Sequence, residues 1–286
     1  MGDISRRITR KSLKAKRKAA IKTIKVQAKE KIHQIKVDYS MDAEKKKQKA
    51  AEKEHKKELR AQKANARLSY NARQLRPFTL GEDILSSITN GIGAGLSVTA
   101  IVLLVIRAAF LSPEPHRIVY ISSFAVFGAS LFILHLVSTL YHAISSLAAR
   151  KVFSVFNHCA IYLFIGGLYT PFLLICLSGA ASTTGCAAVW TVCALLIALY
   201  AVLGERLHTF AVFTYVAFAV VFAAAVFSGN VPVKMPCSAL LFSGAAVYAV
   251  SLILFLMRNY KWTHSIFHLF SLGGAVLMFF SVYYLV

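Results

Sequence analysis

Long apolar segments separated by short polar stretches occupy the chain from residue 82 onward. We distinguish seven of them, at roughly 82–107, 118–144, 155–177, 184–203, 209–228, 236–257 and 262–286. Each approaches the roughly 20 residues that an apolar α-helix needs to cross a bilayer. Because the connections are short, the pattern predicts an all-α fold, an integral membrane bundle of seven transmembrane helices with little mass outside the membrane.

The beginning of the chain shows the opposite pattern. Residues 1–80 hold 25 of the 33 basic and 8 of the 12 acidic residues, and so carry +17 of the net charge of +21. The composition favours helix, but Ile21, Ile24, Ile32 and Ile35 are not continued into a sustained apolar stripe, so we expect no stable coiled coil. We therefore predict a basic arm, residues 1–77, partly helical and partly disordered, and a membrane domain, residues 78–286.

The basic arm has two interpretations. Its charge favours attraction to anionic lipid or to nucleic acid, at about 1 kcal/mol for each basic residue close to an anionic surface. Alternatively, the arm is a topogenic anchor that orients the membrane domain and has no specific ligand.

Basic residues also predict how the chain is oriented in the cell membrane. The positive-inside tendency keeps the arm in the cytoplasm, which places the C-terminus outside. Turns on the predicted cytoplasmic side carry Arg150, Lys151, Arg206, Arg258 and Lys261, whereas outside turns carry Arg107, Arg117 and Lys234. The difference between the turns is small, but it agrees with the arm.

With this topology, polar residues that are distant in sequence lie at one level of the bundle, the cytoplasmic side. They are His142 at the end of the second segment, Asn157 and His158 at the start of the third, His264 and His268 at the start of the seventh, and Glu82 and Asp83 at the start of the first. Polar groups in lipid are costly unless they face the bundle and find partners.

Three of these histidines suit a metal ion. His264 and His268 are four residues apart and stack on one helical face, about 6 Å apart. Such a pair near a membrane surface is also typical of interfacial or hydrogen-bonded histidines. In the second segment, however, His135, Ser138 and His142 share one face of an otherwise apolar helix. His142, His264 and His268 can supply three neutral nitrogens and leave a fourth position for water, as in a catalytic Zn²⁺ site.

The five cysteines indicate neither disulfides nor a thiolate metal site. Cys159, Cys176, Cys186, Cys193 and Cys237 lie within or beside apolar segments and show no CxxC spacing. We interpret them as small packing residues.

Four motifs in order give the membrane domain a family resemblance. They are Leu-Gly-Glu82-Asp with Ile-Thr-Asn-Gly-Ile-Gly at 88–93, Ser138-Thr-Leu-Tyr-His142, Asn157-His158-Cys-Ala-Ile-Tyr with Tyr169-Thr-Pro171-Phe, and His264-Ser-Ile-Phe-His268-Leu-Phe. Residues 78–286 resemble the hemolysin III group of the progestin and adipoQ receptor superfamily, which is related to the alkaline ceramidases. The motifs cover nearly all of the membrane domain and none of the basic arm.

The resemblance implies a seven-helix protein with a cytoplasmic N-terminus and zinc held by His142, His264 and His268. The family has an Asp at the start of the third helix, where it can serve as the base. This chain has Asn157 there, which can orient a water molecule but cannot accept its proton. Asn90 and Leu168 also replace the family's usual His and Thr.

Two functions remain open. In the first, the protein is an intramembrane zinc amidohydrolase that acts on a membrane lipid, with Ser138 stabilising the oxyanion, Asn157 positioning water, and Glu82 available as a nearby carboxylate. In the second, it is a non-catalytic, zinc-stabilised protein that senses lipid or permeabilises membranes. A pore is the less favoured form of the second, because the segments offer few polar residues to line one.

Overall fold

The computed structural model describes residues 2–39, 43–74, 78–257 and 260–286, and all regular structure in these ranges is helical. The all-α prediction is therefore confirmed. The chain divides into two compact units, Met1–Pro77 and Phe78–Val286. The first unit contains α1 (Gly2–Asp38) and α2 (Ala43–Gln74). Arg258, used above in the orientation argument, lies outside the described residues.

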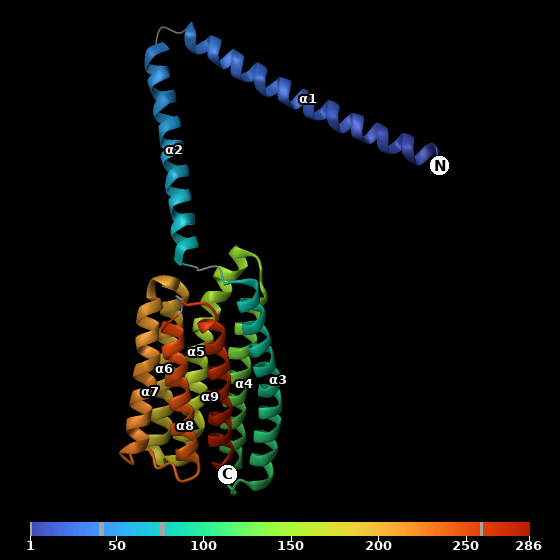
Figure 1. The fold of residues 1–286 in the computed structure, drawn as a ribbon. Helices are drawn as coiled ribbons and strands as arrows, with labels where there is room; N and C mark the ends of the chain where they lie inside the picture. Colours follow the sequence, from blue (N-terminus) through green and yellow to red (C-terminus); the bar gives the residue numbers. More distant parts are fainter. Residues whose placement is uncertain (1, 40–42, 75–77, 258–259) are drawn as a thin grey trace. The chain divides into compact units, whose positions relative to one another are not determined.

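The second unit is a bundle of roughly parallel and antiparallel helices (Figure 1). Its helices are α3 (Leu80–Leu111), α4 (Arg117–Ala143), α5 (Leu147–Cys176), α6 (Gly179–Leu203), α7 (His208–Phe227), α8 (Cys237–Leu256) and α9 (Thr263–Tyr283), with a 3₁₀ turn, η1 (Gly204–Leu207), between α6 and α7.

Six helical stretches of the described residues are long and apolar enough to cross a membrane. Five of them are single helices, and the sixth, Gly179–Phe227, contains α6, η1 and α7. The chain is thus a multi-pass membrane protein by length and composition of its helices.

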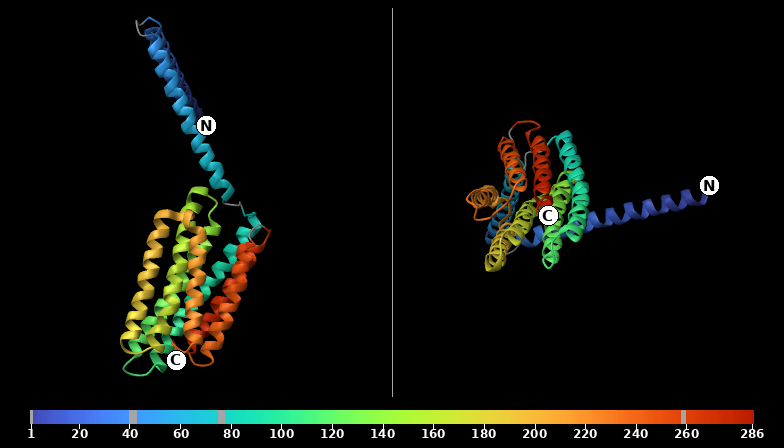
Figure 2. Two further views of the ribbon diagram at one scale, coloured as in Figure 1. Left: turned by 90° about the vertical axis from the view of Figure 1, so that its left-hand side faces the viewer. Right: turned by 90° about the horizontal axis from the view of Figure 1, so that it is seen from below.

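The chain reverses direction inside the longest stretch (Figure 2). Hydrogen bonds from α5 show the reversal, because α6 pairs with α5 in antiparallel order and α7 pairs with it in parallel order. The pairs are Cys159–Ile197 and Thr170–Trp190 for α6, and Tyr162–Thr214 and Tyr169–Phe218 for α7. Gly204 makes the turn possible, since it has a positive φ of 57°.

The first turn of α3 is joined to the first turn of α9. Thr79 caps α3, and the Glu82 carboxylate completes a capping box by accepting from the Thr79 backbone N–H at 2.9 Å. The other oxygen of Glu82 accepts from the backbone N–H of Trp262, just before α9, at 2.7 Å. The Ser265 hydroxyl donates to the Glu82 carbonyl oxygen at 2.9 Å. These bonds fix where α9 begins relative to α3.

Polar and apolar side chains occupy different levels of the bundle. The fully buried Leu104, Phe124, Phe127 and Phe172 form the apolar core near the end of α3 and the beginning of α4. The buried histidines and Glu82 lie near the opposite end, where α3 and α9 begin and α4 ends. Gly93 lets α3 approach α4 at this polar level, because a Cβ there would lie 2.6 Å from Nδ1 of His135.

Candidate metal centre

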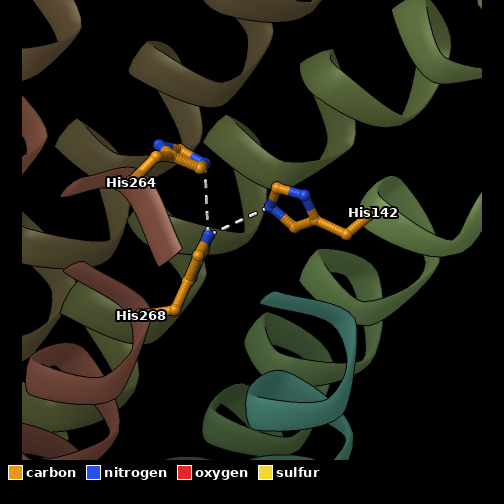
Figure 3. Close-up of side chains that lie close together, drawn as sticks. All are labelled: His142, His264 and His268. Carbon is orange, nitrogen blue, oxygen red and sulfur yellow. Dashed lines mark hydrogen bonds between the residues drawn. The ribbon is translucent and has the colours of Figure 1, made fainter. Parts of the chain in front are cut away.

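Three histidine nitrogens converge inside the bundle (Figure 3). His142 comes from the last turn of α4, and His264 and His268 come from the start of α9. Nε2 of His268 lies 3.0 Å from Nε2 of His142 and 3.3 Å from Nε2 of His264. All three side chains are buried, and one ligand atom from each lies within 4.8 Å of the others. The group can hold a metal ion.

Two of the nitrogen separations are close to those of a tetrahedral zinc site. Zn–N bonds of about 2.0–2.1 Å place two ligand nitrogens roughly 3.3 Å apart, and Nε2 of His268 lies 3.0 Å from Nε2 of His142 and 3.3 Å from Nε2 of His264. A hydrogen must lie between two imidazole nitrogens at such a distance when they bond directly to each other. A metal ion would replace that hydrogen, so its binding would displace a proton.

A carboxylate lies behind His142. Nδ1 of His142 is 3.1 Å from Oδ1 of Asp83, at the start of α3. Arg150, in the first turn of α5, forms an ion pair with the same carboxylate. Because His142 donates its Nδ1 hydrogen to Asp83, its Nε2 lone pair faces the other two histidines, as metal binding requires.

Asn90 lies behind His268. Its side-chain nitrogen donates to the Ser86 carbonyl oxygen at 2.8 Å and lies 3.0 Å from Nδ1 of His268. Its side-chain oxygen lies 3.3 Å from Nδ1 of His135. Asn90 on α3 thus contacts an imidazole on α4 through its oxygen and an imidazole on α9 through its nitrogen. Because the amide nitrogen can only donate, Nδ1 of His268 accepts from it, and the ring hydrogen of His268 lies on Nε2, where a metal ion would replace it.

Aromatic rings pack around His264. Phe78 stacks on it with ring centroids 4.3 Å apart and an angle of 19°, and also contacts His142 at 5.7 Å. Phe267 and Phe255 lie 5.6 and 6.3 Å from the same ring. These rings separate the histidine group from solvent and lower the local dielectric constant.

The residues predicted to assist catalysis differ in their surroundings. Ser138 is buried one turn before His142 on α4, and none of the hydrogen bonds of the described residues joins it to the three histidines. Asn157 is half-buried on α5, with a buried side-chain oxygen that has no hydrogen-bond partner among the described residues. The Glu82 carboxylate accepts the bonds that cap α3 and begin α9.

Sequence reasoning assigned no role to Asp83, Asn90 or Phe78. A signal for Asn90 was present, because Ser86, Asn90 and Ser97 interrupt an apolar helix at helical spacing and are all buried. Asp83 was noted at the right level, but nothing in the sequence favours it over Glu82 beside it. Phe78 lies before the helix, where periodicity carries no information.

These observations define a class, the multi-pass helical membrane proteins with a buried three-histidine group that can hold a metal ion. The chain belongs to the haemolysin III family, since the protein-family model described as Haemolysin-III related matches residues 78–279. This family is a member of the progestin and adipoQ receptor superfamily, and the resemblance expected from the motifs is confirmed.

Two relatives support the assignment. Hemolysin-3 of Bacillus cereus is 36% identical over 205 residues, which cover 72% of this chain and 92% of the relative. Hemolysin-3 homolog of Bacillus subtilis (strain 168) is 35% identical over 205 residues, which cover 72% of this chain and 94% of the relative.

Proposed function

We propose that this chain is an intramembrane zinc hydrolase that cleaves amide bonds of membrane lipids at the group formed by His142, His264 and His268. The observation that carries the proposal is the convergence of three buried Nε2 atoms, one of them held in the ligand tautomer by Asp83. Zinc bound by three protein ligands supplies a Lewis acid that polarises a carbonyl group and lowers the pKa of a coordinated water molecule to about 7.

The chain's own residues would orient the reactants. Ser138 lies on the same face of α4 as His142 and would donate to the carbonyl oxygen as negative charge develops there. The free side-chain oxygen of Asn157 would accept a hydrogen bond from the attacking water. Asp83 and Asn90 would hold the rings of His142 and His268, while Phe78 would exclude bulk water.

A second candidate is a non-catalytic, zinc-stabilised protein that senses lipid or permeabilises membranes. Two observations favour it: the Asn157 amide cannot accept a proton, and the Glu82 carboxylate is engaged at the helix starts. The name hemolysin carried by the relatives suggests permeabilisation. We rank a pore below sensing, because an ion pathway normally needs a polar lining.

We also propose that α6 and α7 cross the membrane separately, which gives seven crossings of the cell membrane. The N-terminus is then cytoplasmic, the C-terminus is outside, and the zinc site lies near the cytoplasmic face. The reversal between α6 and α7 supports this topology. Single cysteines introduced next to the end of α4 or the start of α9 should react with an impermeant maleimide from the cytoplasmic side of the membrane only. Labelling of the C-terminal end from the cytoplasm would contradict the proposal.

Zinc content tests the metal site. Replacing His142, His264 or His268 by Ala should lower bound zinc well below one per chain, because two remaining ligands leave an incomplete buried group. His116→Ala, at the exposed start of α4, is the matched control and should keep full zinc. Full zinc in the triple His→Ala variant would exclude this site.

Turnover of a short fluorescent ceramide tests the catalytic proposal. At equal zinc loading, Asn157→Asp should raise turnover, because a carboxylate near the metal can take a proton from water and pass one to the departing amine. Such proton transfer contributes about 10²- to 10⁴-fold. Equal zinc-dependent turnover in both proteins would show that the base lies elsewhere. No turnover in either would favour the non-catalytic candidate.

A further inference from the structure

A cavity of about 270 Å³ lies between α3, α4 and α9, apart from the three metal-binding histidines. We call it the α3–α9 groove. Its lining is mostly aliphatic and aromatic and includes Leu96, Ala100, Leu103, Leu131, Val276 and Phe279. Gly93 and Leu103 are ten residues apart on α3, so the lining extends roughly 15 Å along the helix. The volume is close to the lower end of small-molecule sites and too small for a lipid with two acyl chains.

One of the residues that line the groove, His135, has a buried polar atom that lacks a partner. His135 is 3% exposed, and its Nε2 has no hydrogen-bond partner among the described residues. The other polar side chains of the lining differ in this respect. Ser97 donates to the Gly93 carbonyl oxygen at 2.7 Å, and Thr99 lies 3.5 Å from the Gly95 carbonyl oxygen.

The neighbours of His135 determine what its Nε2 needs. The Ser86 carbonyl can only accept, so the atom of Asn90 that faces it at 2.8 Å is the amide nitrogen. Asn90 therefore presents its oxygen to Nδ1 of His135, and Nδ1 donates to it. In a neutral imidazole, Nε2 is then a hydrogen-bond acceptor, and the missing partner is a donor.

We propose that the α3–α9 groove binds a single-chain lipid alcohol, with its hydroxyl group donating to Nε2 of His135 and its apolar chain lying along α3 and α9. A hydrocarbon would fill the groove but leave the buried acceptor unsatisfied, which is unfavourable. An ether or ester offers no donor. A charged headgroup would lose its hydration against an apolar lining without gaining an ion pair.

This proposal goes beyond the proposed zinc chemistry and does not depend on it. The groove and the metal site share the Asn90 amide, which contacts both His135 and His268, but no ligand nitrogen of the metal site lines the groove. Binding of the alcohol can therefore be measured whether or not the protein hydrolyses lipid amides.

Photocrosslinking in lipid nanodiscs tests the proposal. The full-length protein is labelled with 1-dodecanol that carries a diazirine at mid-chain, and the labelled residues are mapped by mass spectrometry. Labels are expected on α3 and α9 at groove residues. Unlabelled 1-dodecanol should compete at least tenfold more strongly than 1-methoxydodecane or dodecane, neither of which can donate to Nε2. Equal competition by the three compounds would overturn the proposal.

Variants locate the site. His135→Phe keeps an aromatic ring but removes the acceptor, and should reduce specific labelling at least tenfold. Val276→Phe should block the groove, whereas Val98→Phe is the matched control, because Val98 is 49% exposed on α3 and does not line the groove. Undiminished labelling in both His135→Phe and Val276→Phe would show that the alcohol binds elsewhere. If His135→Phe fails to fold, the proposal is still tested by the competition experiment in the native protein and by comparing labelling of the Val276→Phe and Val98→Phe variants.

Discussion

Two adjacent carboxylates, Glu82 and Asp83, have different tasks at the start of α3. Successive residues of a helix point about 100° apart, so Glu82 faces the backbone before α9 while Asp83 faces His142 and Arg150. Asp83 is thus the carboxylate that contacts a histidine of the candidate metal centre. Partners of this kind fix the tautomer and the orientation of a ligating imidazole.

We predict that Asp83→Ala weakens zinc binding by about 10- to 100-fold, the loss typical of removing such a partner. The His142 ring would lose its Nδ1 acceptor, and Arg150 would lose its ion pair. Titration of purified protein with zinc against a chromophoric chelator measures the change. Asp83→Asn, which keeps an oxygen acceptor, should lose less.

A matched control for this prediction is Glu114→Ala. Glu114 pairs with Arg117 at an exposed position and is remote from the histidines in the fold, so its removal should leave zinc affinity unchanged. An Asp83→Ala protein with the affinity of the native chain would show that the His142–Asp83 contact does not position the ligand.

The three histidines that the sequence analysis placed at one level do lie close together, but the sequence did not indicate the residues that contact them. His264 and His268 are related by helical spacing, and topology brings His142 to their level. Which of Asp83 and Glu82 faces His142 depends on the rotation of α3 about its axis. That rotation is set by close packing such as the Gly93–His135 approach, which a single sequence does not reveal.

At the scale of elements, the apolar segments predicted the helices well, and the differences have physical causes. The segment predicted to begin at residue 184 corresponds to α6, which begins at Gly179. Its first turns contain Ser and Thr, which lower the apolar signal but bond inside the helix, as Thr184 does to the Ala180 carbonyl oxygen at 2.6 Å. Hydroxyl side chains can therefore lengthen a membrane helix beyond its apolar segment.

The connection between α3 and α9 gives a prediction about Glu82. Glu82 is 1% exposed, and its carboxylate accepts from Thr79 and from the Trp262 backbone, where the chain has a strained φ of 67°. Glu82→Ala would remove the charged acceptor of both hydrogen bonds, and a hydrogen bond to a charged group contributes about 1.5–3 kcal/mol. We expect the metal-free protein to melt at a lower temperature, measured by intrinsic fluorescence in detergent.

The melting temperature of the metal-free protein distinguishes a structural role of Glu82 from a catalytic one. A purely catalytic Glu82 would leave the melting temperature of metal-free protein unchanged when replaced, and only turnover would fall. Glu82→Gln is the graded variant, since it retains one oxygen acceptor and should melt between the native protein and Glu82→Ala. An unchanged melting temperature in Glu82→Ala would contradict the structural role.

At the scale of the whole molecule, the haemolysin III match and the buried group of three histidines both fall within the second unit. The family match covers residues 78–279, so the basic residues of α1 and α2 lie outside it. The described side chains of α1 are almost all exposed, including Ile24, Ile32 and Ile35. The arm's interaction with anionic lipid or nucleic acid therefore remains a proposal that rests on charge.

We predict that deleting residues 1–77 leaves the melting temperature and zinc content of the membrane unit unchanged. Phe78 begins the second unit and stacks on His264, so the deletion keeps the aromatic ring that covers this histidine. The full-length and truncated proteins are compared after purification from membranes. Cysteine labelling confirms that both have the same orientation, because loss of the basic residues can itself alter insertion.

The same pair of proteins tests what the arm binds. If the arm contacts anionic lipid, the full-length protein in nanodiscs should capture anionic vesicles at low salt, and the truncated protein should not, with the difference vanishing as salt screens the charges. Capture of duplex DNA instead would favour nucleic acid, and capture of neither would favour a topogenic anchor. A large fall in the melting temperature of correctly inserted truncated protein would show that the arm belongs to the folded core.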